Sequence, residues 1–179
     1  MGLYTPACSS NDSFACSPRR NENSAHVRNG EKTMTKSPIE MLLENHARIK
    51  GLLDRFDEAR EDDARQRLIA SSLAEIAIHG ALRQELVIPA MHEALEDSSV
   101  ADWAARDYEE QTHTMLEISA THSPSTRITK FQGFVETVKR QLEEEEQRLV
   151  PKLKGMELQE LGERMAKRRE ELERVRLFL

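Results

Sequence analysis

The sequence has 179 residues, about the length of one domain, and its formal net charge of −6 argues against nucleic acid or an anionic membrane surface as the main partner. Only 4% of the residues are aromatic, and glycine and proline are scarce, which disfavours an all-β fold with many tight turns. The sequence has no apolar run of transmembrane length and no secretory signal, so we expect a helical, soluble protein of the cytoplasm.

The chain is expected to begin with a tail and then to become ordered abruptly. Residues 1–36 are rich in Ser, Asn, Gly, Pro and Arg and have no apolar periodicity, which predicts a disordered tail. The only two cysteines lie in this tail, and they indicate neither a zinc site nor a disulfide framework. Order should begin at the tetrapeptide Ser-Pro-Ile-Glu at 37–40, because it is a capping box with proline at the first helical position. The first helix is predicted to continue to about Arg60.

Four more helices are predicted, at about 63–95, 100–119, 126–153 and 158–175. Pro89 lies late in the first of these and is expected to kink it. Ser125, just before the helix predicted at 126–153, is a candidate helix cap. Helices of about 20–30 residues with short connections are typical of an antiparallel four-helix bundle. The fold class is therefore expected to be all-α, with the bundle and the extra C-terminal helix together occupying residues 37–176.

Ionisable residues interrupt the apolar stripes of three predicted helices. His46 lies between Leu42 and Ile49 on the first stripe, and His79 and Arg83 lie one turn apart on the second. Glu145 interrupts the apolar stripe of the helix predicted at 126–153 in the same way. A buried unpaired charge costs several kcal/mol, so such groups must be paired or must bind something. Imidazoles and carboxylates that face each other across helices are how helical bundles hold iron or manganese.

The helix predicted at 100–119 gives no comparable indication of a buried ionisable residue. Its amphipathicity is weak, and only Leu116 and Ala120 share the face of His113. Periodicity alone therefore makes His113 a surface residue.

Four segments, taken in chain order, resemble the hemerythrin-like (HHE cation-binding) family. They are LLENHARIKGLLDRF, IAIHGALRQELVIPAM, EEQTHTMLEI and QLEEEEQRLVPKL, and the similarity extends over about residues 37–172. This resemblance implies a four-helix bundle that holds two irons by histidines and bridging carboxylates. It also implies a role in dioxygen binding, in iron handling, or in redox and nitrosative-stress sensing. By motif position, the implied metal ligands are His46, His79, His113 and Glu145.

Two positions depart from the family pattern. Arg83 stands where a bridging glutamate is usual, and Gln141 stands where a histidine is usual. Arginine has no lone pair to offer an ion, so the metal site is expected to be altered and degenerate. In one outcome the four implied ligands hold one iron ion, helped by Glu109. In the other, Arg83 pairs with Glu145 and takes the place of the metal.

These alternatives lead to three functional hypotheses. The first is a hemerythrin-like protein that binds or senses dioxygen or another small diatomic ligand through one or two iron ions. The second is a metal-free helical adaptor that uses its charged last helix or its tail for partners. The third is an iron enzyme with, for instance, a peroxidase-like activity. No serine or cysteine lies in a recognisable nucleophile motif, so binding or sensing is favoured over turnover.

Overall fold

The computed structural model describes residues 36–156 and 158–176, and within them all regular structure is helical. The chain separates into two units, residues 1–33 and 34–179, and every described residue belongs to the second. The predicted tail, 1–36, therefore lies almost entirely outside the described residues. Among those residues, no helix combines the length and apolar character that crossing a membrane requires.

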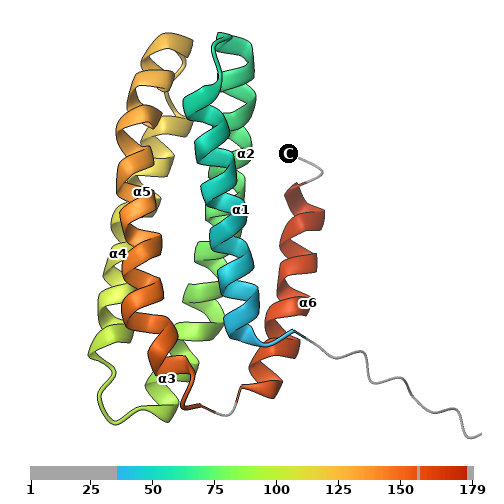
Figure 1. Cartoon of the computed structure of the whole chain (residues 1–179), viewed down its shortest axis with the longest axis vertical. Helices are drawn as coiled ribbons and strands as arrows, with labels where there is room; N and C mark the ends of the chain where they lie inside the picture. Colours follow the sequence, from blue (N-terminus) through green and yellow to red (C-terminus); the bar gives the residue numbers. More distant parts are fainter. Residues whose placement is uncertain (1–35, 157, 177–179) are drawn as a thin grey trace, which may run out of the picture. The chain divides into compact units, whose positions relative to one another are not determined.

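Four long helices stand side by side, and successive ones run in opposite directions (Figure 1). They are α1 (Pro38–Glu58), α2 (Asp62–Leu82), α4 (Ser99–Ser119) and α5 (Pro124–Leu153). The last helix, α6 (Gln159–Arg176), packs against α1 and α2.

Helix ends follow the local chemistry of the sequence. The Ser37 side chain accepts a hydrogen bond from the Glu40 amide, and the Glu40 carboxylate accepts one from the Ser37 amide, so the predicted capping box is present. At α5 the prediction was wrong by two residues. Ser123, not Ser125, is the N-cap, because Pro124 can occupy the first helical position without needing its missing amide hydrogen.

The predicted helix at 63–95 is divided into three parts. After α2 comes a π-helical turn, η1 (Arg83–Val87), and then the short helix α3 (Ile88–Ala94). Pro89 has no amide hydrogen, and its ring would clash with the carbonyl four residues earlier in an ideal α-helix. The wider π-turn directly before it accommodates this conflict. Arg83 stands at the start of this turn.

The interior consists of two apolar clusters with a polar layer between them. One cluster contains Ile49, Ile76 and Leu142, and the other contains Leu42 and Leu149. Helices α1, α4 and α5 contribute to both clusters, whereas α2 contributes to the first and its continuation through η1 and α3 contributes to the second. The residues between those contributions lie at one level of the interior. The predicted inward-facing ionisable groups all fall in this layer. Leu43, which follows the buried Leu42 on α1, is 40% exposed.

Candidate metal centre

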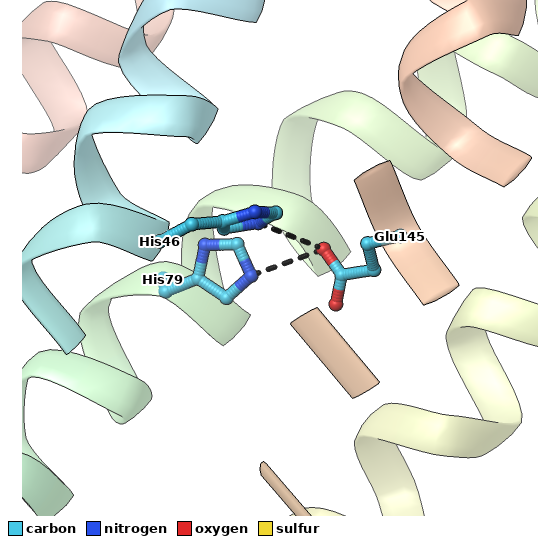
Figure 2. A group of neighbouring side chains, drawn as sticks. All are labelled: His46, His79 and Glu145. Atoms are coloured by element: carbon cyan, nitrogen blue, oxygen red, sulfur yellow. Dashed lines mark hydrogen bonds and ion pairs between the residues drawn. The ribbon is translucent and has the colours of Figure 1, made fainter. Parts of the chain in front are cut away.

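Three side chains from three helices meet inside the polar layer (Figure 2). His46 comes from α1, His79 from α2 and Glu145 from α5. Each residue is at most 2% exposed. One nitrogen or oxygen atom from each residue lies within 4.8 Å of the others. The sequence prediction that these three residues face the interior agrees with their positions.

One carboxylate oxygen stands between the two imidazoles. Glu145 Oε2 lies 3.2 Å from His79 Nε2 and 3.4 Å from His46 Nε2. The two rings are in edge contact, with their centroids 4.9 Å apart. Two nitrogen atoms and one oxygen atom therefore converge on a single small volume.

The other carboxylate oxygen is taken by an arginine. Arg83 is fully buried, and its Nη1 forms an ion pair with Glu145 Oε1. Its Nη2 lies 3.7 Å from Asp107 Oδ2 of α4. Burial lowers the pKa of Arg83 to about 10, with Asp107 opposing that shift, so the guanidinium is charged at neutral pH. Glu145 thus faces a fixed cation on one side and two imidazoles on the other.

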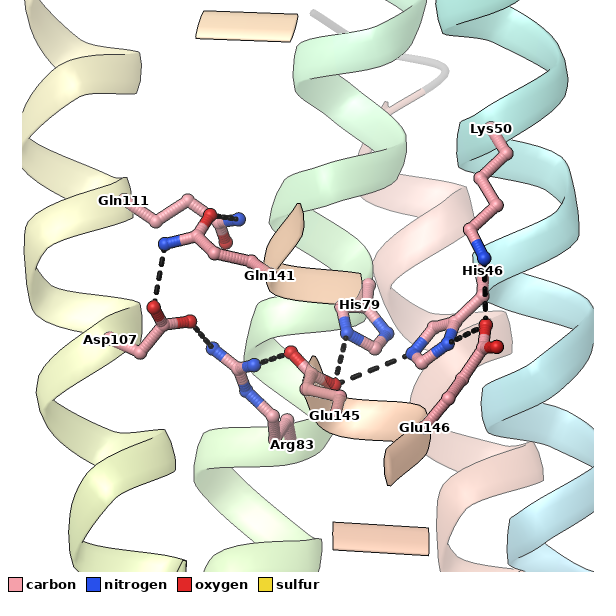
Figure 3. A network of polar contacts seen from close by, with 9 residues as sticks. All are labelled: His46, Lys50, His79, Arg83, Asp107, Gln111, Gln141, Glu145 and Glu146. Carbon is pink, nitrogen blue, oxygen red and sulfur yellow. Dashed lines mark hydrogen bonds and ion pairs between the residues drawn. The ribbon is translucent and has the colours of Figure 1, made fainter. Parts of the chain in front are cut away.

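Amide side chains complete the layer beyond Arg83 (Figure 3). Gln141 Nε2 donates to Asp107 Oδ1 at 2.7 Å, and Gln111 Nε2 donates to Gln141 Oε1 at 3.0 Å. Burial raises the pKa of Asp107, while Arg83 and Gln141 oppose this shift. On this side of the layer, the carboxylate of Asp107 faces the guanidinium of Arg83.

The burial of both imidazoles favours their neutral forms. Desolvation lowers the pKa of His46, and it lowers that of His79 well below its ordinary value, with the neighbouring His46 ring and the Arg83 guanidinium adding to the shift at His79. A neutral imidazole carries one nitrogen lone pair, which is the form that binds a metal ion. Both rings are therefore neutral, which is the charge state that ligation requires.

The structure does not bring His113 to this cluster. Its side chain is 77% exposed, and its Nδ1 lies 3.7 Å from Glu117 on the same helix. Glu109, the suggested additional donor, is exposed as well. The inward face of α4 instead carries Ala104, Gln111 and Ile118, which recur every seven residues.

The donor set fits one ion rather than two. His46 Nε2 is buried and makes no hydrogen bond to any described residue, although it faces the Glu145 carboxylate. Such an atom is satisfied if a cation binds there. The position on the far side of the carboxylate already contains the guanidinium of Arg83, which cannot ligate a metal. Gln141 has its amide engaged by Asp107 and Gln111.

A second buried polar group lies next to the centre, toward α6. Arg169 of α6 donates to Asn45 Oδ1 and to Glu75 Oε1. Asn45 precedes His46 in the chain, and Glu75 lies one helical turn before His79. A single residue of α6 thus ties together the two helices that carry the imidazoles.

Sequence reasoning missed Asp107, Gln111 and the pair formed by Lys50 and Glu146. Glu146 Oε1 lies 3.0 Å from both His46 Nδ1 and Lys50 Nζ. Gln111 was detectable, because it shares the heptad spacing of Ala104 and Ile118. Glu146 belongs to a run of four glutamates that is typical of a solvated surface, so no pattern distinguished it.

Comparisons with models of protein families, with curated proteins and with solved structures gave no match to this chain.

Proposed function

We propose that this chain is a hemerythrin-like four-helix-bundle protein that holds a single iron ion and binds or senses a small diatomic ligand such as dioxygen. The observation that carries the proposal is the buried convergence of His46, His79 and Glu145 within 4.8 Å. Two histidines and one carboxylate are a recognised ligand set for ferrous iron with open coordination positions. The family is proposed from the four sequence segments and the order of the helices.

The residues around the ion would have two different roles, ligation and control of the carboxylate. His46 Nε2, His79 Nε2 and Glu145 Oε2 would hold it, since these atoms already face one another. Iron held in this way supplies positions at which a diatomic ligand can bind. Arg83 would keep the second oxygen of Glu145 engaged, so the carboxylate would bind one ion only. No nucleophile motif accompanies the centre, which favours binding or sensing over turnover.

Metal content tests this proposal. Protein purified without chelators, or reconstituted with ferrous iron under anaerobic conditions, should contain about one iron per chain by elemental analysis. His46→Ala should lose that iron. His113→Ala is the matched control and should keep it, because His113 is exposed and is not one of the three converging donors. Absence of iron after reconstitution, or equal loss in both variants, would contradict the proposal.

A metal-free adaptor is the second candidate, and the Arg83–Glu145 ion pair favours it. With that pair formed, a cation already faces the buried carboxylate. An adaptor also needs a surface for its partner. An apolar groove of about 710 Å³ lies between α2 and α6 and is lined by alanines of α2 together with Leu172 and Val175. Elemental analysis separates the two candidates, because the adaptor should contain no iron after reconstitution.

A further inference from the structure

We propose that Glu146 is the positioning residue of this centre, and that its carboxylate fixes the ring orientation and tautomer of His46 so that Nε2 is left free to bind a cation. The inference rests on the proposed function only for the identity of the cation. The tautomer itself is a property of the metal-free protein.

The contacts of Glu146 determine which partner donates in its hydrogen bond with His46 (Figure 3). Its Oε1 lies 3.0 Å from His46 Nδ1 and 3.0 Å from Lys50 Nζ. The Glu146 side chain is 34% exposed and in ion-pair contact with the Lys50 ammonium, so it is present as a carboxylate. An ionised carboxylate can only accept hydrogen bonds. His46 must therefore donate from Nδ1.

The consequence appears at the other nitrogen of the same ring. A neutral imidazole has one N–H, so a proton on Nδ1 leaves Nε2 with a bare lone pair. That atom is buried, makes no hydrogen bond to the described residues and lies 3.4 Å from Glu145 Oε2. Two electron-rich atoms that face each other in this way are stabilised by a cation between them. Glu146 thus prepares His46 for ligation without touching the ion.

His79 lacks such a partner. Its Nε2 is hydrogen-bonded to Glu145 Oε2 at 3.2 Å, whereas its buried Nδ1 has no hydrogen-bond partner in the described part of the chain. In the metal-free protein His79 can satisfy Glu145 by donating from Nε2. To bind an ion through Nε2 it must move that proton to Nδ1. The two imidazoles are therefore unequal, and only His46 is oriented in advance.

Consecutive positions on α5 provide both carboxylates. Successive residues of an α-helix point about 100° apart, so Glu145 faces the interior while Glu146 faces α1. On α1, Lys50 follows His46 by one turn and reaches the same oxygen of Glu146. Carboxylates that accept from the second nitrogen of a ligating histidine commonly set its tautomer and strengthen binding.

Nitrogen-15 NMR of the imidazole rings in chelator-treated protein tests the proposal directly. In the wild type, His46 should show a protonated Nδ1 and an unprotonated Nε2. Glu146→Leu removes the acceptor and should move the proton to Nε2, where it can be donated to Glu145. Glu143→Leu is the matched control, since it removes an exposed carboxylate of the same run, and it should leave the tautomer unchanged.

A competition titration with ferrous iron gives the second readout. Glu146→Leu should weaken binding by about 10–100-fold, as loss of such an outer partner commonly does. The control should bind as the wild type does. A wild-type His46 with its proton on Nε2, or an unchanged tautomer in Glu146→Leu, would overturn the inference. If the tautomers follow the prediction but no variant binds iron, the positioning role stands and the proposed function fails.

Discussion

Replacing Arg83 with methionine should strongly destabilise the metal-free protein. Methionine has a similar length but no charge, so Arg83→Met leaves the Glu145 carboxylate buried without its cation. Glu145 is 2% exposed and Arg83 is 0% exposed, so water screens their ion pair little. Removing one partner of a buried pair costs about 3–5 kcal/mol of the free energy of unfolding. In the wild-type protein both imidazoles beside Glu145 are neutral, so Arg83 is the cation that faces this carboxylate.

Urea unfolding of chelator-treated protein measures this cost. With a denaturant slope of about 2 kcal/mol per molar urea, the midpoint should fall by about 1.5–2.5 M. The double variant Arg83→Met/Glu145→Leu should recover most of the loss, because neither charge is then left alone. Arg168→Met is the surface control. It breaks an exposed ion pair with Glu85 and should cost no more than about 1 kcal/mol.

Two results would refute this reasoning. If Arg83→Met costs less than about 1 kcal/mol, the pair with Glu145 is no stronger than an exposed one. If the double variant loses as much stability as the sum of the two single variants, the two side chains are not coupled.

Three further predictions concern the same polar layer and its packing. Arg83→Glu places a second carboxylate beside the first, so it should destabilise the metal-free protein and raise its affinity for iron in a titration. Burial lowers the pKa of both core imidazoles below 6.5, so the unfolded chain takes up protons first as the pH falls. Chelator-treated protein should therefore lose up to about 1.4 kcal/mol per pH unit for each ring below pH 6.5, and His79→Gln should reduce this slope in urea unfolding. A Cβ atom at Gly80 would overlap the Tyr108 ring, so Gly80→Ala should lower the melting temperature, whereas Gly51→Ala, which meets no atom, should raise it.

Much of the interior was predictable because helical periodicity reports burial. His46 and Glu145 each lie between apolar residues of one stripe, and both are buried. Arg83 was predicted to face the same interior by its one-turn spacing from His79, and it does so from the start of the π-helical turn. Helical spacing alone therefore predicted that these ionisable side chains face the interior.

The resemblance and the periodicity disagreed at His113, and the structure places this side chain on the exposed side of α4. A histidine in a matching segment does not fix its rotation about the helix axis. That rotation is set by what packs, and the heptad of Ala104, Gln111 and Ile118 faces inward. Motif position in the resemblance favoured the histidine, whereas periodicity made it a surface residue, and the structure agrees with the periodicity.

Apart from the Arg83–Glu145 pair, which was one of the two predicted outcomes, the contacts between helices were beyond sequence reasoning. The interaction of Glu146 with His46 joins residues 100 positions apart, and that of Arg169 with Glu75 joins residues 94 apart. Charged residues in long polar runs have no periodicity that reveals a distant partner. The π-helical turn was equally hidden, because Pro89 indicates a disturbance of the helix but not how the backbone accommodates it.

Under the proposed function, the interior holds one iron ion beside the buried Arg83. Native mass spectrometry of metal-free protein, titrated anaerobically with ferrous iron, tests it most directly. One ion should bind per chain, and Glu145→Gln should abolish its binding. If no ion binds, the result contradicts the iron site and favours the metal-free adaptor. Binding of two ions per chain would contradict the position assigned to Arg83.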